Sequence, residues 1–122
     1  MLPSIIGYRE RALKPGDRLA GLARDAVTYL DVCNDPEFAQ DFNIRAADVR
    51  GNFKARPDAI RVYLAEDITV DFWWARNAED LGLDDLRERL FFLRGLLRAR
   101  GPRTWNYVNL TLDNYEKNTV VE

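Results

Sequence analysis

The chain has 122 residues, of which 47% are hydrophobic and 31% are charged, a composition typical of a globular protein. Its formal net charge of −2 at neutral pH gives no reason to expect nucleic acid as a partner. It contains no apolar run of the ~20 residues that a membrane-spanning helix needs, and no signal-peptide pattern. We therefore expect residues 1–122 to form a single domain.

The first part of the chain is expected to contain a loop followed by one amphipathic helix. Prolines and glycines break up residues 1–16, a pattern typical of a loop. Asp17 can cap a helix, and apolar residues then recur every three or four positions, which predicts a helix over 17–34. Pro36 ends that helix because proline cannot continue it. The less regular segment 38–49 indicates a short helical turn and then a strand.

Two runs of alternating apolar and polar residues predict a β-hairpin in the middle of the chain. The runs cover residues 59–65 and 68–75 and are similar in length. The dipeptide Glu66-Asp67 lies between them and predicts the turn. The hairpin is the best-defined element that the sequence offers.

The last third of the chain predicts a helix and two strands. Leucines spaced three and four apart indicate a helix over 83–99, with Asp84 as its cap and Gly101 at its end. Strands are expected at 105–112 and 118–121.

Together these elements predict an α+β fold: a mostly antiparallel sheet with two main helices packed on one face. The apolar faces of the helices and strands are expected to meet in one core. The residues expected there are Leu22, Val27, Leu30, Val62, Leu64, Val70, Leu86, Leu90, Leu93, Leu97, Val108 and Leu110.

The sequence lacks the residue types of several common catalytic sites. It contains no histidine, which excludes Ser-His-Asp and Cys-His nucleophiles and most zinc sites. The acidic pair Asp84-Asp85 is expected to stabilise the start of a helix rather than to act in catalysis. Cys33 is alone and is expected to be a small buried apolar residue. We expect no catalytic residues, cofactor, metal or small-molecule substrate.

An alternative is a small enzyme or ligand-binding domain that uses a pair of carboxylates on the same α+β scaffold. Such a protein would have a concave pocket holding two acids with strongly perturbed pKa values. A free-standing protein of another role is a further alternative.

Three segments carry a family resemblance. They are LPSIIG at 2–7, LDDLRERLFFLRGLL at 83–97 and YVNL at 107–110. Their order, with the hairpin before the leucine-rich helix, resembles the C-terminal extracytoplasmic β domain of the FtsQ/DivIB bacterial cell-division proteins. The resemblance covers nearly the whole chain, although none of its motifs is long.

The resemblance implies a non-catalytic scaffold domain of the divisome. Its partners would be FtsB/FtsL-type bitopic proteins, bound by strand addition at a C-terminal edge of the sheet. It would act on the extracytoplasmic (periplasmic) face of the bacterial inner membrane at the division site. The membrane anchor and the POTRA module of the family would then precede these 122 residues.

The partner-binding surface is expected in the final part of the chain, with an outward tryptophan as a further candidate. Thr111 and Leu112 stand where some family members have a basic and an aromatic residue, so a salt bridge to an acidic partner is not expected there. Alternation along 68–75 places Trp74 in the core and Trp73 outside it. The expected partner-binding residues are Thr111, Leu112, Asp113, Asn114, Tyr115, Val120 and Trp73.

Overall fold

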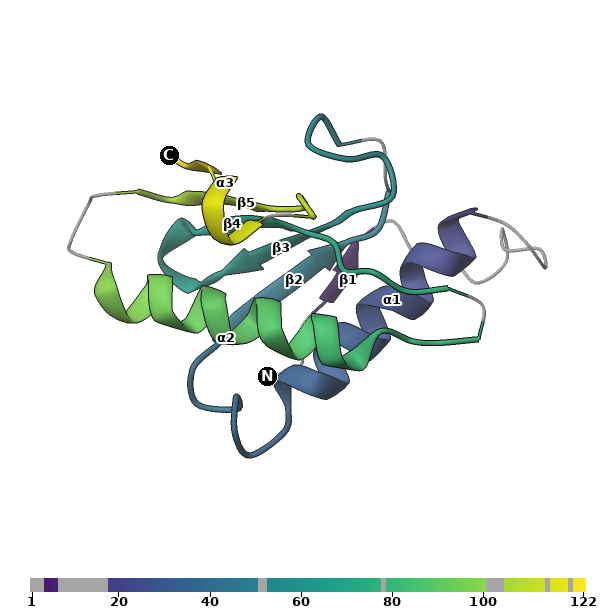
Figure 1. Cartoon of the computed structure of the whole chain (residues 1–122), viewed down its shortest axis with the longest axis horizontal. Coiled ribbons are helices and arrows are strands. Elements are labelled where there is room, and N and C mark those ends of the chain that lie inside the picture. The colour runs from purple at the N-terminus through teal and green to yellow at the C-terminus, as the bar shows by residue number, and fades with distance from the viewer. Residues whose placement is uncertain are drawn as a thin grey trace.

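The computed structural model describes residues 4–6, 18–50, 53–77, 79–100, 105–113, 115–118 and 120–122. Its strands are β1 (Ser4–Ile6), β2 (Ile44–Asp48), β3 (Ile60–Leu64), β4 (Thr69–Phe72), β5 (Tyr107–Leu110) and β6 (Val120–Val121). Its helices are α1 (Arg18–Cys33), α2 (Leu83–Ala99), the short α3 (Tyr115–Asn118) and the 3-10 turn η2 (Ala65–Asp67) (Figure 1). None of the helices in these ranges is both long enough and apolar enough to cross a bilayer.

The strands described form one open sheet in the order β1-β2-β3-β4-β5-β6. The pairs β1–β2 and β4–β5 are parallel, and the other neighbouring pairs are antiparallel. The α+β class is therefore confirmed, but the sheet is mixed where a mostly antiparallel one was expected. The cause is the position of the helices: α1 connects β1 to β2 and α2 connects β4 to β5, and a helical crossover joins parallel strands.

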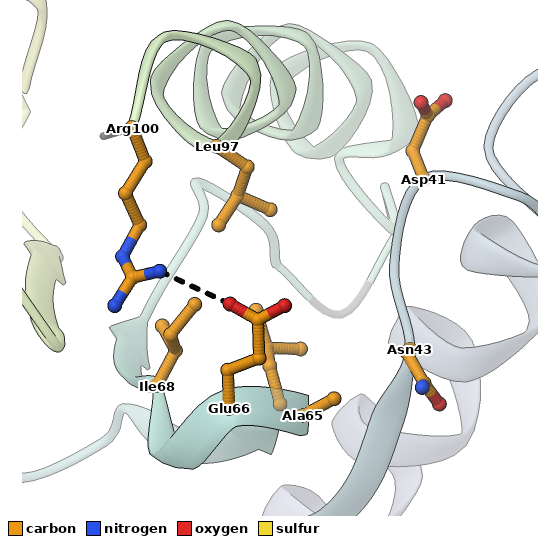
Figure 2. A pocket seen from close by; sticks show the side chains of 8 residues that line it. Asp41, Asn43, Ala65, Glu66, Ile68, Leu97 and Arg100 are labelled. Carbon is orange, nitrogen blue, oxygen red and sulfur yellow. Dashed lines mark hydrogen bonds and ion pairs between the residues drawn. The ribbon is translucent and has the colours of Figure 1, made fainter. Parts of the chain in front are cut away.

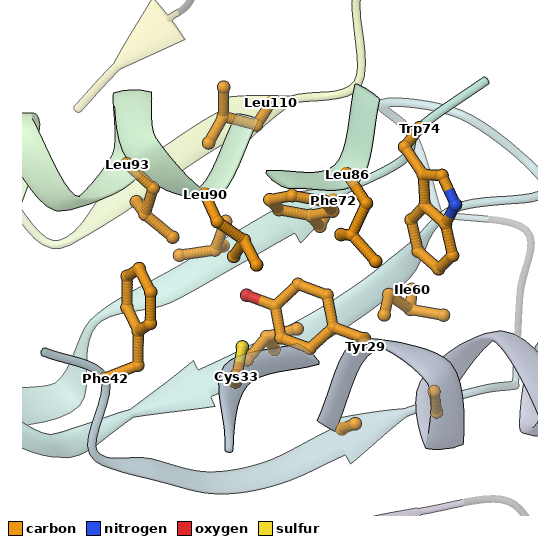
Figure 3. Close-up of a cluster of buried hydrophobic side chains, with 14 of the residues drawn as sticks. Tyr29, Cys33, Phe42, Ile60, Phe72, Trp74, Leu86, Leu90, Leu93 and Leu110 are labelled. Carbon is orange, nitrogen blue, oxygen red and sulfur yellow. The ribbon is translucent and has the colours of Figure 1, made fainter. Parts of the chain in front are cut away.

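Both long helices contribute to a single core against the sheet (Figure 1). Side chains from α1, α2 and the strands converge there, and Tyr29 of α1 packs edge-on against Phe72 of β4 with ring centroids 4.8 Å apart (Figure 3). Leu90 of α2 lies in the same cluster and is fully buried. Strand β3 alternates between buried and half-buried residues, so its apolar side chains face the helices.

Most of the expected core is confirmed. The residues found buried as predicted are Leu22, Val62, Leu64, Val70, Leu86, Leu90, Leu93, Val108 and Leu110. Leu30 and Leu97 pack against this cluster but are only partly buried. Val27 was wrongly placed in the core, since it is 49% exposed. The buried face of α1 instead runs through Tyr29 and Cys33, four residues apart, which turns Val27 toward solvent.

The hairpin and both long helices agree with the sequence prediction. The turn between β3 and β4 falls at Glu66 and Asp67, whose positive φ angles of 64° and 60° suit a tight hairpin connection. The start of α2 differs in one respect: its N-cap is Gly82, not Asp84. Gly82 has a φ of 67°, and a Cβ there would lie 1.8 Å from the carbonyl oxygen of Ala75.

The C-terminal region differs from the prediction at two points. Strand β5 ends at Leu110 instead of continuing to Leu112, and the chain turns there. The short helix α3 then precedes β6, which is reduced to Val120–Val121. The predicted cap Asp17 lies outside the residues that the structure describes.

Candidate functional site

The C-terminal side of the sheet ends in a short strand, which we call the β6 edge (Val120–Glu122). Within the described ranges β6 pairs only with β5, and no strand lies beyond it. The backbone groups of Glu122 and Tyr107 exchange both hydrogen bonds, each with an N···O distance of 2.9 Å. In an antiparallel pair the neighbouring residue points its backbone groups the other way. The N–H and C=O of Val121 are therefore directed away from β5.

The side chains of the β6 edge leave room for a partner. Val121 pairs with Val108, whose side chain is fully buried, and yet Val121 itself is 37% exposed. An exposed apolar residue beside unpaired backbone groups is the combination that strand addition uses. The β6 edge can therefore supply both main-chain hydrogen bonds and apolar contact.

Two arginines fix the chain where it leaves β5. Arg89 of α2 donates from Nη1 to the carbonyl oxygens of Leu110 at 3.1 Å and Leu112 at 2.8 Å. Arg56 donates from Nη1 to the carbonyl oxygen of Thr111 at 3.0 Å. Three consecutive carbonyls thus accept hydrogen bonds from guanidinium groups, although the Leu110 oxygen also accepts one from the backbone N–H of Trp73 at 3.4 Å. This arrangement ends β5 at Leu110 and directs the chain toward α3.

The indole of Trp73 lies between the same two arginines. The guanidinium carbon of Arg56 is 3.5 Å from the centroid of the Trp73 ring, and that of Arg89 is 5.2 Å away. The ring nitrogen donates to Asp58 at 3.2 Å. Trp73 lies outside the core as predicted, whereas Trp74 is 1% exposed. Because arginines stack on its ring, Trp73 stabilises the turn after β5 from within the domain.

Two of the residues expected to bind a partner are buried inside the domain. The side chain of Thr111 is fully buried, and its hydroxyl donates to Asn109 at 2.6 Å. Tyr115 is 5% exposed and packs against Phe92 with ring centroids 5.3 Å apart. Their side chains therefore stabilise the turn and cannot form the contact surface that was expected of them.

The remaining expected residues are more accessible or lie elsewhere. Leu112 is half-buried, and the Asp113 side chain is 84% exposed. Val120 is the first residue of β6, while Asn114 falls outside the described residues. Sequence reasoning did not select Val121, although its position next to Val120 in the strand predicted at 118–121 was a usable signal.

A polar row crosses the face of the sheet opposite the helices. The register places Asp48, Arg61, Asp71 and Asn109 side by side on β2 to β5. Asp71 is fully buried and accepts two hydrogen bonds from Arg61, at 2.7 and 3.0 Å. The Tyr107 hydroxyl also donates to Asp71 at 2.5 Å. Burial, and next the hydrogen bond to this carboxylate, raise the pKa of Tyr107 well above its ordinary value.

This geometry predicts a loss of stability in alkaline solution. The phenol stays protonated in the folded protein above pH ~10, whereas in the unfolded chain it ionises there. The unfolded state then binds fewer protons, so the free energy of unfolding must fall as pH rises from ~10. Tyr107→Phe should reduce this slope by up to about 1.4 kcal/mol per pH unit, measured by urea unfolding at several pH values. An unchanged slope would show that Tyr107 ionises normally in the folded state.

A pocket of about 300 Å³ lies between the β3–β4 turn and the end of α2. Figure 2 shows Glu66 and Arg100 pointing toward one another across it, joined at 3.1 Å, with Asp41 on the far side. Asp41 is bound by Arg98 at 2.9 Å and by Arg94 at 3.4 Å. Each acid that lines this pocket is thus paired with arginine rather than with another carboxylate.

Two further observations concern reactive groups. The described ranges contain no cluster of three or more histidine, cysteine or acidic residues that could hold a metal ion. Cys33 is buried at the end of α1, and burial raises the pKa of its thiol to about 12. A thiol with so high a pKa is a weak nucleophile at neutral pH.

No family model, no curated protein and no solved structure matches this chain. The resemblance to the β domain of FtsQ/DivIB proteins therefore remains a prediction that rests on the quoted sequence motifs.

Proposed function

We propose that this domain is a non-catalytic scaffold that binds a partner by strand addition at the β6 edge. The resemblance to FtsQ/DivIB proteins suggests the partner class: FtsB/FtsL-type division proteins. The domain would then act on the extracytoplasmic side of the bacterial inner membrane, held there by an N-terminal anchor. Its role would be to hold the partners together at the division site during septum formation.

One observation carries the proposal: the backbone groups of Val121 point away from β5, and no described strand covers them. The side chain beside them is exposed and apolar. Arg89 and Arg56 fix the end of β5, the strand to which β6 is bonded, so the support of the edge is in place before a partner arrives. Such pre-organisation reduces the entropy lost on binding.

The proposal predicts that Val121→Pro abolishes partner binding without unfolding the domain. Proline removes the outward N–H but takes no hydrogen bond from β5, because β5 is bonded by residues on either side of Val121, such as Glu122. We expect at least a tenfold loss of affinity, about 1.4 kcal/mol, for an extracytoplasmic fragment of an FtsB/FtsL-type protein. Isothermal titration calorimetry measures this loss, and circular dichroism checks the fold.

Val121→Thr is the matched control, since threonine keeps the N–H and the β-branched shape. It should bind within about threefold of the original chain. Equal binding by the proline and threonine variants would place the interface away from the β6 edge.

A further inference from the structure

We infer that the β6 edge selects a basic partner strand, with positively charged side chains on one face and apolar side chains on the other. This inference rests on the proposed strand addition and specifies the chemistry of its partner. It follows from the charges that surround the edge and from the faces on which its side chains lie.

The first step is the charge around the edge. Glu122 lies at the end of β6, Glu116 lies on α3 just before it, and both are exposed. The charged side chains that the structure describes on α3 and at the β6 edge are Glu116 and Glu122, and both are acidic. Lys117 belongs to α3, but its side chain lies outside the described set. The charged side chains that the structure describes beside a new strand would therefore be the carboxylates of Glu116 and Glu122.

Two basic groups that the structure describes at the turn after β5 are already engaged. Arg56 lies 3.9 Å from the exposed carboxylate of Asp113 and also donates to a backbone carbonyl. Arg89 is 2% exposed and is enclosed by its backbone acceptors and Asp85. Neither offers its charge to an incoming chain. A partner strand with acidic residues would meet repulsion, whereas lysine or arginine would meet free carboxylates.

The side chains of the β6 edge lie on definite faces of the sheet. Paired residues on neighbouring strands have their side chains on the same face. Glu122 pairs with Tyr107, whose hydroxyl binds Asp71 on the face opposite the helices. Burial raises the pKa of Tyr107 most, and the hydrogen bond and charge of Asp71 raise it further. The charge of Glu122 makes a smaller contribution in the same direction. Glu122 therefore lies on that open face.

Val121 lies on the other face, since it pairs with the buried Val108. A strand added beside β6 places alternate side chains on the two faces. Residues beside Glu122 should be basic, and residues beside Val121 should be apolar. The expected partner pattern is an alternation of lysine or arginine with valine, isoleucine or leucine.

Two labelled peptides test this inference with the intact chain. Both have valine at alternate positions, and the positions between them hold lysine in one peptide and glutamate in the other. Fluorescence anisotropy at low ionic strength should show at least about fivefold tighter binding of the lysine peptide. Added salt should reduce the difference, because exposed charges are screened. Glu122→Lys should reverse the preference.

Two variants separate the possible results. Glu79→Lys changes the net charge equally at an exposed loop position and should leave the preference intact. Val121→Pro should abolish binding of the lysine peptide. Equal affinity of the two peptides, or a preference that survives Glu122→Lys, overturns the charge inference and leaves strand addition standing. If neither peptide binds at millimolar concentration, the proposed strand addition falls as well.

Discussion

Replacing Leu90 with alanine is expected to lower the free energy of unfolding by about 2–5 kcal/mol. Leu90 is fully buried on α2 and lies among side chains from α1 and the sheet (Figure 3). Truncation removes apolar surface from the core and leaves a cavity. The surrounding side chains of α1, α2 and the sheet are packed too closely to move far, so they fill that cavity only in part. Urea denaturation followed by circular dichroism measures the change.

Val27→Ala is the matched control on the other long helix. Because Val27 is 49% exposed, its truncation should cost less than about 0.5 kcal/mol. Similar losses for the two variants would mean that Leu90 does not occupy the central position described above.

Arg89→Met is expected to cost about 3–5 kcal/mol, although methionine keeps most of the apolar length of the side chain. The substitution leaves the carbonyls of Leu110 and Leu112 without their guanidinium donor, and it removes the ion pair with Asp85. Buried acceptors that lose a charged donor are costly because water cannot replace it fully. Chemical denaturation gives the total loss.

Hydrogen exchange locates the effect of the Arg89 substitution. The amide of Glu122, which binds Tyr107, should lose protection more than the amides of α1 do, because Arg89 fixes the chain that leads to β6. Arg87→Met is the control: Arg87 is 37% exposed, pairs with Asp35, and should contribute less than about 1 kcal/mol. A cost for Arg89→Met no larger than that of the control would contradict the anchoring role.

The regular elements could be predicted because their hydrophobic periods are local. Helix α2 was predicted at its observed limits, and the β3–β4 hairpin was predicted together with its turn. Both predictions were possible because each element depends on side chains close in sequence. The end of β5 could not be predicted in this way. It depends on Arg89, 21 positions before Leu110, and on Arg56, 55 positions before Thr111.

The sequence predicted which region of the chain forms the candidate site, but not which of its side chains are exposed. The sequence indicated that the last strand would lie at the C-terminal side of the sheet, but it did not indicate which side chains the turn would bury. Thr111 and Tyr115 were predicted to bind a partner because they lie close to the expected C-terminal edge strand, in the region that the family resemblance implies. The hydroxyl of Thr111 binds Asn109, two positions earlier, whereas Tyr115 packs against Phe92 of α2, a contact that only the tertiary arrangement makes.

The polar row across the face opposite the helices fixes how the strands align. Slipping one strand of the hairpin by a single residue would turn Arg61 or Asp71 toward the helices. A charged group would then enter the apolar core without its partner, which is far more costly than the loss of one hydrogen bond. The Arg61–Asp71 pair thus fixes the register of the central strands. The centre of the sheet can keep one register while a strand at the β6 edge joins or leaves.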